Sequence, residues 1–305
     1  SDSSQPIACL IKNTTSSGLS NCCWYSGLLW GLETIAWNSS LLFRVTNILI
    51  DLDKIPNNSN WENKPFTTLQ SFYRPHWPQC LATVDQKVQI LKVVLERDES
   101  FAWRFIFSLI PRGGSIGLNN SRPVWRDDDA GSESERNIYY PHYISWFVET
   151  VLKLAKGNPN RISELMDCYK LFDGEYKESL VLLIEELSSF DDNGKEIILS
   201  RLRKHISFYQ SDYIDDKDDY LERIKSAYYD NQPQDIIVRY RWLFKNRWIN
   251  LPEGERNNYE KNDELRNQYR LNAIEHIWEE LGSSGIERLL MCVEDIWLVG
   301  NYTAR

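Results

Sequence analysis

The chain has 305 residues, 42% hydrophobic and 26% charged, which excludes an intrinsically disordered chain and favours one extended or two compact units. Its net charge of −9 is uneven: residues 1–126 carry 12 Lys and Arg against 9 Asp and Glu, a balance of +3, whereas the remainder carries 23 against 35, a balance of −12. This acidic balance argues against a broad nucleic-acid surface, which needs clustered positive charge.

Helical periodicity dominates the first part of the chain. It predicts helices over residues 22–36, from Ser39 or Ser40 as the cap to residue 52, from the Thr83 cap to residue 95, and over 101–109, with a polar loop at 54–64. The apolar side chains expected to face inward are Trp24, Leu28, Leu29, Leu32 and Ile35, then Leu42, Val45, Ile48, Leu49 and Leu52, then Val84, Val88, Leu91 and Leu95, and finally Phe101, Phe105, Ile106 and Leu109.

One long irregular segment separates two halves. Residues 111–137 are broken throughout by Pro, Gly, Asn and Ser and end in an acidic stretch. Long loops of this kind are usually functional or disordered. We therefore expect an N-terminal helical subdomain, residues 1–130, that ends in this loop, and a C-terminal helical-repeat subdomain, residues 131–305.

The second half is more regular. Pro141 suits the first position of a helix, and Gly282 suits the end of a long amphipathic helix over residues 259–281. Further helices are expected near 160–171, 175–190, 194–209, 216–229, 234–244 and 284–295. Short linkers between them imply antiparallel neighbours. The predicted fold is all-α, an α-solenoid or irregular helical-repeat array of about a dozen antiparallel helices.

Two sequence patterns resemble catalytic motifs. Residues 113–117 match G-x-S-x-G around Ser115, but that nucleophile elbow needs a strand before it and a helix directly after it. Asp51 and Asp53, followed by Glu62 and Lys64, resemble the spacing of a metal-dependent nuclease, which also needs neighbouring strands. No strand is predicted at either place. We expect no catalytic residue, no cofactor and no metal site.

The remaining polar residues also favour structural roles. The six cysteines have no zinc-ligand spacing, so free thiols in a reducing, cytoplasmic compartment are expected. His276 precedes Glu279 and Glu280 at ion-pair spacing. The acidic run 212–219 suits a solvated helix start better than a Ca²⁺ site. No apolar run reaches the ~20 residues of a membrane helix.

Tryptophan and arginine on irregular backbone suggest a surface for a protein partner, because these residues often anchor interfaces. The alternative for the segment around Trp125 is a strut that pins the loop to the helices, with Arg126 paired to Asp127–Asp129. The candidate partner-binding residues are Trp61, His76, Trp77, Arg112, Arg122, Trp125 and Arg126.

Several segments together carry a family resemblance. They are GLLWGLETIAWNSSLLFRVTNILIDLDKI, the run from Trp61 to Pro78, FAWRFIFSLIPRGG with SRPVWRD, PQDIIVRYRWLFKNRWINLPEG, and the closing GIERLLMCVEDIWLVG. In this order they resemble the C-terminal helical region of large bacterial STAND-type proteins, the signal-transducing P-loop NTPases of antiphage defence. The resemblance covers most of the chain from about residue 8, and is weaker over 158–232.

The resemblance implies a helical-repeat sensor that binds a foreign (phage) protein and relays that event to NTPase and effector domains elsewhere in a larger intracellular protein. It carries over no catalytic residue. The expected partners are a protein and other domains of the parent chain, with neither nucleic acid nor membrane. The alternative role is a structural or oligomerisation scaffold within the same large protein.

Overall fold

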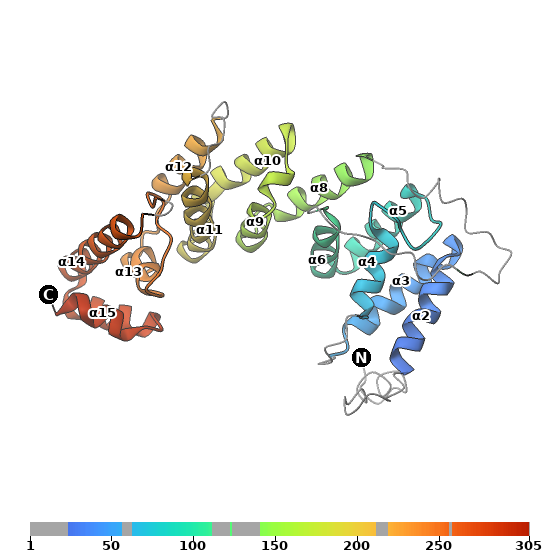
Figure 1. Ribbon diagram of the computed structural model, residues 1–305, viewed down its shortest axis with the longest axis horizontal. Helices are drawn as coiled ribbons and strands as arrows, with labels where there is room; N and C mark the ends of the chain where they lie inside the picture. The colour runs from blue at the N-terminus through green and yellow to red at the C-terminus, as the bar shows by residue number, and fades with distance from the viewer. Residues whose placement is uncertain are drawn as a thin grey trace. The chain divides into compact units, whose positions relative to one another are not determined.

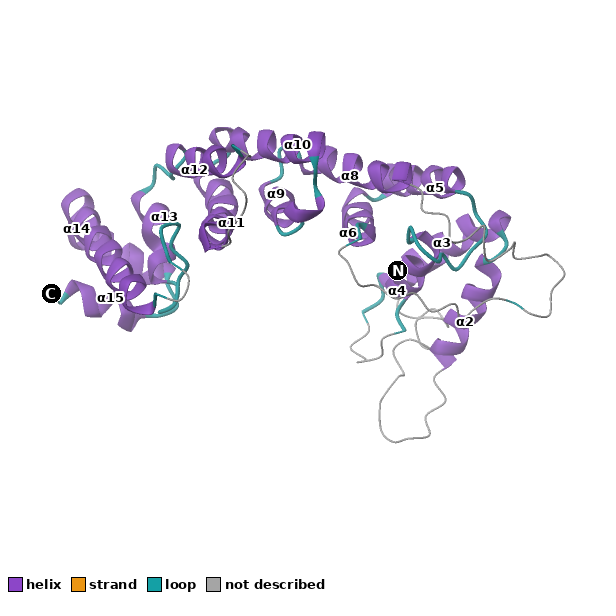
Figure 2. Cartoon of the chain, turned by 45° about the horizontal axis from the view of Figure 1, so that its top comes forward, coloured by secondary structure: helices purple, strands orange, loops and turns teal. Residues whose placement is uncertain are grey.

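The computed structural model describes residues 24–56, 63–111, 123, 141–211, 219–255 and 258–304, with the side chains of residues 24 and 208–211 left out. Over these ranges every regular element is a helix, and Figure 2 shows no strand. The all-α fold predicted from periodicity is confirmed. The described residues hold thirteen α-helices and three 3₁₀ helices, in agreement with the dozen expected.

The chain forms two compact units, residues 1–151 and 152–305. Their boundary lies within α8 (Pro141–Ala155), whereas the sequence placed it near residue 130. Most of the irregular segment 111–137 lies outside the described residues. Each unit has its own buried core, so the two are described separately.

Unit 1 contains α2 (Trp24–Ala36), α3 (Ser39–Asp53), α4 (Pro65–Tyr73), α5 (Val84–Arg97), α6 (Glu99–Leu109) and the start of α8. Helix α4, which the periodicity did not predict, packs against α2, α3 and α6 (Figure 1). Its Phe66 and Tyr73 rings meet Phe105 of α6 edge to face, with centroids 5.6 and 5.5 Å apart. Such aromatic contacts bury much apolar area with defined geometry.

Of the two helix N-caps predicted in unit 1, the one at α5 is confirmed and the one at α3 is wrong. Thr83 accepts a hydrogen bond from the Gln86 amide while the Gln86 side chain accepts from the Thr83 amide, so the predicted cap is confirmed as a full capping box. At α3 the cap is Asn38, whose Oδ1 accepts from the Ser40 amide. Ser39 and Ser40 are instead the first residues of the helix.

Three predicted inward positions of unit 1 differ from the structure. Ile35 is 40% exposed and Ile48 is 43% exposed, because the buried arcs of α2 and α3 centre on neighbouring positions and leave these two at the edge. On α5 the buried positions are Lys87, Leu91 and Val94, so Leu91 agrees with the predicted stripe whereas Val88 is only half-buried. A lysine therefore occupies a core position that the hydrophobic pattern assigned to Val88.

Unit 2 continues with α9 (Pro159–Met166), η1 (Tyr169–Leu171), α10 (Gly174–Glu185), η2 (Glu186–Ser189), α11 (Asp192–Ser211), α12 (Tyr220–Asp230), α13 (Ile236–Tyr240), η3 (Arg241–Phe244), α14 (Tyr259–Cys292) and α15 (Ile296–Thr303). Helix α9 packs against α11, α10 against α12, and α11 against α13 (Figure 1). Packing onto the second-next helix is typical of a two-layered helical array.

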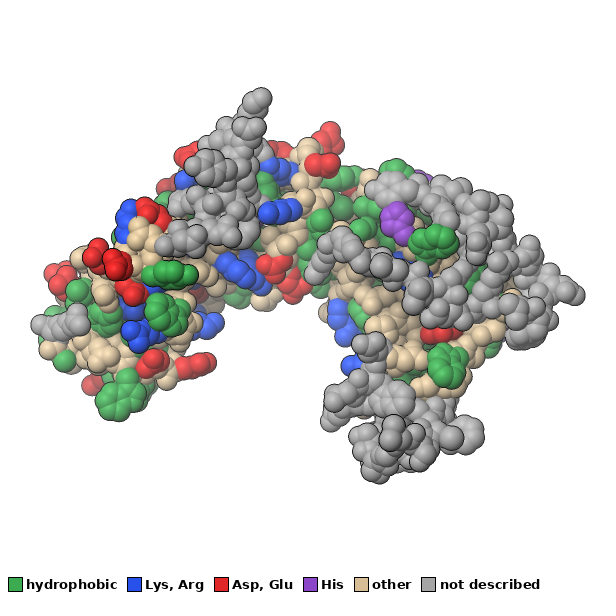
Figure 3. Space-filling view, viewed as in Figure 1, with side chains coloured by type: hydrophobic (Ala, Val, Ile, Leu, Met, Phe, Trp, Pro, Cys, Tyr) green, Lys and Arg blue, Asp and Glu red, His purple; other side chains and the backbone are tan. Residues whose placement is uncertain are grey.

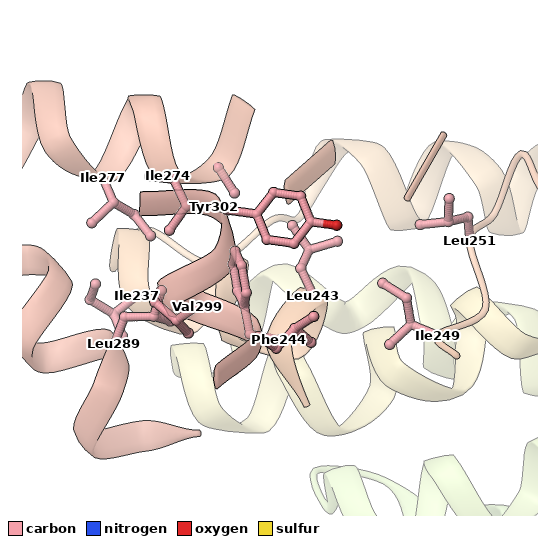
Figure 4. Packing of buried hydrophobic residues seen from close by; sticks show 12 residues of the cluster. Ile237, Leu243, Phe244, Ile249, Leu251, Ile274, Ile277, Leu289, Val299 and Tyr302 are labelled. Atoms are coloured by element: carbon pink, nitrogen blue, oxygen red, sulfur yellow. The ribbon is translucent and has the colours of Figure 1, made fainter. Parts of the chain in front are cut away.

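The end of unit 2 is closed by one core cluster. Side chains from α13, η3, the segment after it, α14 and α15 meet around Phe244 and Tyr302 (Figure 4). Gly282 has φ 61° and ψ −147°, a conformation open to glycine, and breaks the axis of α14 where the sequence placed a helix stop. Beyond this kink Leu289 returns to the same core, so the kink folds the chain back onto it.

Candidate partner-binding groove

Five of the seven predicted partner-binding residues, Trp61, Arg112, Arg122, Trp125 and Arg126, lie outside the described residues. His76 and Trp77 are described and exposed on the turn after α4. Trp77 has φ 50°, and its carbonyl accepts a hydrogen bond from the Arg74 guanidinium. The structure thus places these two predicted residues together at the surface, on a turn held by the hydrogen bond between Arg74 and Trp77.

Of the two motifs that resemble enzyme sites, the described carboxylates form ion pairs with other helices. Ser115 and Glu62 lie outside the described residues. Asp53 pairs with Arg104, and Asp51 lies 3.7 Å from Arg97, so both carboxylates of α3 form ion pairs with cations of other helices. Within the described ranges no group of three or more His, Cys, Asp or Glu side chains is placed to hold a metal ion.

The histidines of unit 2 bond to tyrosines. Tyr240 Oη lies 2.9 Å from His276 Nδ1, which is a different partner from the glutamates expected on the same helix face. Tyr220 Oη lies 2.8 Å from His205 Nε2. Asp219, the described residue of the acidic run, stands at the start of α12 as expected for a helix entrance; residues 212–218 lie outside the described ranges.

A groove runs along α11 in unit 2. It has a volume of about 720 Å³, and side chains of α9, α11, η3 and the residues just after α14 line it. We call this feature, whose lining includes Glu196, Ser200, Lys204, Trp242 and Lys245, the α11 groove. Over α9 to α11, Figure 3 shows Lys and Arg side chains interspersed with Asp and Glu rather than gathered into a separate patch.

A buried ion pair borders the α11 groove. The Arg203 guanidinium pairs with Glu196 and lies 4.0 Å from the centre of the Trp242 ring. The Arg203 side chain is only 5% exposed and that of Glu196 14%. Burial raises the pKa of Glu196, while Arg203, Arg241 and Lys245 oppose that rise. Several cations are therefore close enough to act on one carboxylate.

This ion pair has unused hydrogen-bonding capacity. Among the described residues, neither Glu196 Oε2 nor Arg203 Nη1 has a hydrogen-bond partner although both atoms are buried. An unsatisfied buried polar atom costs free energy, roughly 1–3 kcal/mol for a typical group. Glu196 also lines the α11 groove, so this incompletely hydrogen-bonded pair lies directly beside the groove.

A smaller pocket adjoins the α11 groove. Its volume is about 170 Å³, and it shares Arg201 and Lys204 with the groove. We call it the side pocket; its other polar lining includes Asp167, Lys170 and His205. Arg201 is held 3.1 Å from Asp167, which fixes the guanidinium at the junction of the two spaces.

The side pocket holds a neutral histidine. Burial, followed by the nearby Lys170 charge, lowers the pKa of His205 to about 4. Its neighbour Tyr220 stacks on Tyr169 with ring centroids 4.0 Å apart, and Lys177 lies about 5 Å from both rings. At neutral pH the imidazole therefore adds no charge to the pocket.

None of the residues that line this groove was predicted from the sequence to bind a partner. One signal was present: Arg203 falls on the same stripe as Leu199, Leu202 and Ile206, all of which are buried. A charged residue within an apolar stripe requires a partner, because an unpaired buried charge is costly. The identity of that partner, Glu196 seven positions earlier with Trp242 on another element, depends on tertiary packing.

Comparisons with known proteins add no relative: no protein-family model, no curated protein and no solved structure matches this chain. Among the described helices, none is both long and apolar enough to cross a membrane. The described cysteines, Cys80, Cys168 and Cys292, form no disulfide.

Proposed function

We propose that this chain is a non-catalytic recognition module that binds a segment of a protein partner in the α11 groove. The observation that carries the proposal is the groove itself, about 720 Å³ in volume and lined by both charged side chains and the Trp242 ring. Binding sites of 300–1,000 Å³ usually combine an apolar surface with a few fixed polar groups. Trp and Arg are also the residues that most often dominate protein interfaces.

The packing of the helices supports this proposal. The groove is lined by three helices that pack on one another or on common neighbours, so its lining is positioned before a partner arrives. A prearranged surface loses less conformational entropy on binding. Together with the resemblance to STAND-type proteins, this leads us to propose that the partner is a foreign (phage) protein and that binding is relayed to other domains of a larger defence protein.

Site-specific photo-crosslinking tests the proposal. A photoreactive residue at Ser200, exposed in the α11 groove, is expected to capture one protein in phage-infected bacterial cells. The same residue at Glu222, whose side chain is 80% exposed on α12, is the control and is expected to capture none. Ser200→Trp, which fills the groove, should abolish binding of the purified partner, whereas Glu222→Trp should not.

Two results would refute the proposal: the same captured proteins at both positions, or unchanged partner affinity in Ser200→Trp. If a parent protein from which this chain has been deleted signalled as well as the intact protein, the proposed relay would be refuted.

A second candidate function is a structural or oligomerisation scaffold. It is favoured by exposed apolar side chains on α14 and α15, where Trp278 is 59%, Ile296 55% and Trp297 81% exposed. Exposed apolar surface is costly in a monomer and is often covered in an assembly. Sedimentation of the isolated chain distinguishes the two: a tight homo-oligomer that dissociates on Trp297→Ser supports the scaffold.

A further inference from the structure

We infer that the α11 groove selects an acidic segment of a protein partner and that the side pocket takes one of its carboxylate side chains. This inference rests on the proposed function and names the chemistry of its partner. The first observation is that the lining of the groove and side pocket has the opposite charge balance from unit 2 as a whole. Unit 2 as a whole carries 22 Lys and Arg against 29 Asp and Glu, a balance of −7. The groove and side pocket together are lined by five Lys and Arg and three Asp and Glu.

The cations come from separate elements and converge on one path. Arg201 and Lys204 belong to α11, Lys170 to η1, Arg241 to η3, and Lys245 follows η3. Lys204 and Lys245 are exposed. Because Arg201 and Lys204 line both spaces, the positive charge is continuous from the groove into the side pocket. An excess of one charge in a concave surface concentrates the opposite charge there.

The interspersed carboxylates favour an acidic peptide over a nucleic acid. Glu196 and Glu294 line the groove, and Asp167 lines the side pocket. A nucleic-acid backbone carries a phosphate at every nucleotide, so it would bring negative charge against these groups. A peptide can place its Asp and Glu opposite the cations and its neutral residues or amide donors opposite the carboxylates.

The side pocket has the size and chemistry for one side chain. Its volume of about 170 Å³ is less than a quarter of the groove, and Lys170, Lys204 and Arg201 bring positive charge to it. His205 is close enough to Lys170 for that charge to lower its pKa, which places both groups around the same small space. A carboxylate entering from the groove would gain charge-assisted hydrogen bonds there.

Fluorescence anisotropy with defined probes tests the inference on the full chain. The main probe is a labelled 12-residue peptide in which Glu and Asp alternate with Gly and Ser. The comparison probes are the same peptide with Gln and Asn, a phosphoserine version of that neutral peptide, and a single-stranded RNA of 12 nucleotides. We expect the acidic peptide to bind at least 10-fold more tightly than each comparison probe.

Two double variants locate the binding. Lys204→Gln with Lys245→Gln removes two groove cations and should weaken acidic-peptide binding about 10-fold, since each partly exposed ion pair is worth up to about 5-fold. Lys153→Gln with Lys156→Gln makes the same change in net charge at two exposed positions, one in the last turn of α8 and one just after it, and should change binding less than 2-fold. Thermal melts of both variants should match that of the parent chain.

Several outcomes would overturn the inference: equal affinity for the acidic and neutral peptides, equal effects of the two double variants, or tighter binding of the RNA or phosphoserine probe lost on Lys204→Gln with Lys245→Gln. A protein captured at Ser200 whose bound segment carries no Asp or Glu would sink this inference and leave the proposed function intact. Acidic-peptide binding without any protein captured at Ser200 would leave this inference intact and refute the proposed function.

Discussion

Both units place a charged side chain in an apolar stripe, yet its surroundings differ. In unit 1, Lys87 is 3% exposed, hydrogen-bonds Cys80 and lies 6.0 Å from the Tyr143 ring centre. In unit 2, Arg203 is equally buried, but its partner Glu196 lines the α11 groove. Lys87 is closed in by its neighbours, whereas the Arg203 pair forms the edge of an open space.

This difference shows how similar local sequences give core in one place and a site in another. Around Lys87, the neighbours of the amine include Cys80 and the Tyr143 ring, both buried. Around Arg203, the tertiary packing leaves two polar atoms of the pair without hydrogen bonds. Most buried polar atoms in proteins have a hydrogen-bond partner, so the two exceptions beside the α11 groove distinguish the Arg203 pair from Lys87.

The largest effect is expected from a third buried cation. Arg270 is 3% exposed and donates hydrogen bonds to the carbonyls of Leu243, Asn246 and Arg247, at 2.9, 3.0 and 3.1 Å. Arg270→Ala removes the donor for three carbonyls and should destabilise unit 2 by about 4 kcal/mol. Hydrogen exchange measured by mass spectrometry should show faster exchange in unit 2 and unchanged exchange in unit 1.

The control for this experiment is Arg247→Ala, which removes an exposed guanidinium from the same segment and should change exchange little. Equal destabilisation of both units by Arg270→Ala would contradict the division into two separately packed cores.

Acid should weaken unit 2 through His205. Because the pKa of His205 is about 4 in the folded chain and about 6.5 when unfolded, the unfolded state binds the extra proton between these values. Stability is therefore fully present above about pH 6.5 and falls as the pH is lowered to about 4, by up to about 3 kcal/mol. His205→Asn should remove this contribution, measured as the difference in urea midpoints between pH 7 and pH 4.5.

Tyr220→Phe keeps the buried imidazole and loses its hydroxyl partner, so it should retain the acid sensitivity. A pH dependence shared by the parent chain and His205→Asn would assign the effect to carboxylates instead.

Removal of the buried charge of Lys87 should stabilise unit 1, whereas removal of the Arg270 charge should destabilise unit 2. Burial is the main cause that lowers the pKa of Lys87, so the folded state disfavours the ammonium ion. Lys87→Met keeps the stem volume, removes the charge and should stabilise unit 1 by about 1 kcal/mol at pH 7. For the parent chain, stability should rise with pH from the lowered pKa towards about 10.5, because the unfolded state then binds more protons.

Hydrogen exchange of unit 1 at pH 7 and urea melts at pH 7 and pH 9.5 measure both effects, with exposed Lys92→Met as the control. Destabilisation by Lys87→Met would mean that its bond to Cys80 outweighs the cost of burying the charge.

The smallest effect is expected at an exposed ion-pair network. Arg223 of α12 donates to two carboxylates of α10, to Glu185 Oε1 at 2.8 Å and to Glu178 Oε2 at 2.8 Å. These hydrogen bonds raise the pKa of Arg223. Because the groups are solvated and salt screens them, Arg223→Gln should shift the thermal midpoint less than any variant above, and the shift should vanish in 1 M NaCl.

The sequence by itself determined the helical elements. Apolar side chains every three to four residues, the Thr83 capping box, Pro141 at the start of α8 and the break at Gly282 act within a few positions of the chain, so they can be read without the fold. Even so, the pattern missed the short α4 and assigned Ile35 and Ile48 to the interior, because burial at the edge of a stripe depends on which helix packs beside it.

Only the tertiary structure decided which charged residues are buried and where a binding surface opens. Lys87 and Arg270 look like ordinary solvent-facing residues in sequence. Arg203 stands out only as a charge within an apolar stripe, and the partners of all three lie on other elements or other turns. The α11 groove forms between α9, α11, η3 and the residues at and just after the end of α14, which lie as much as 131 positions apart, from Ser163 to Glu294. Its shape and charge arise from packing between these distant segments, which local periodicity does not encode.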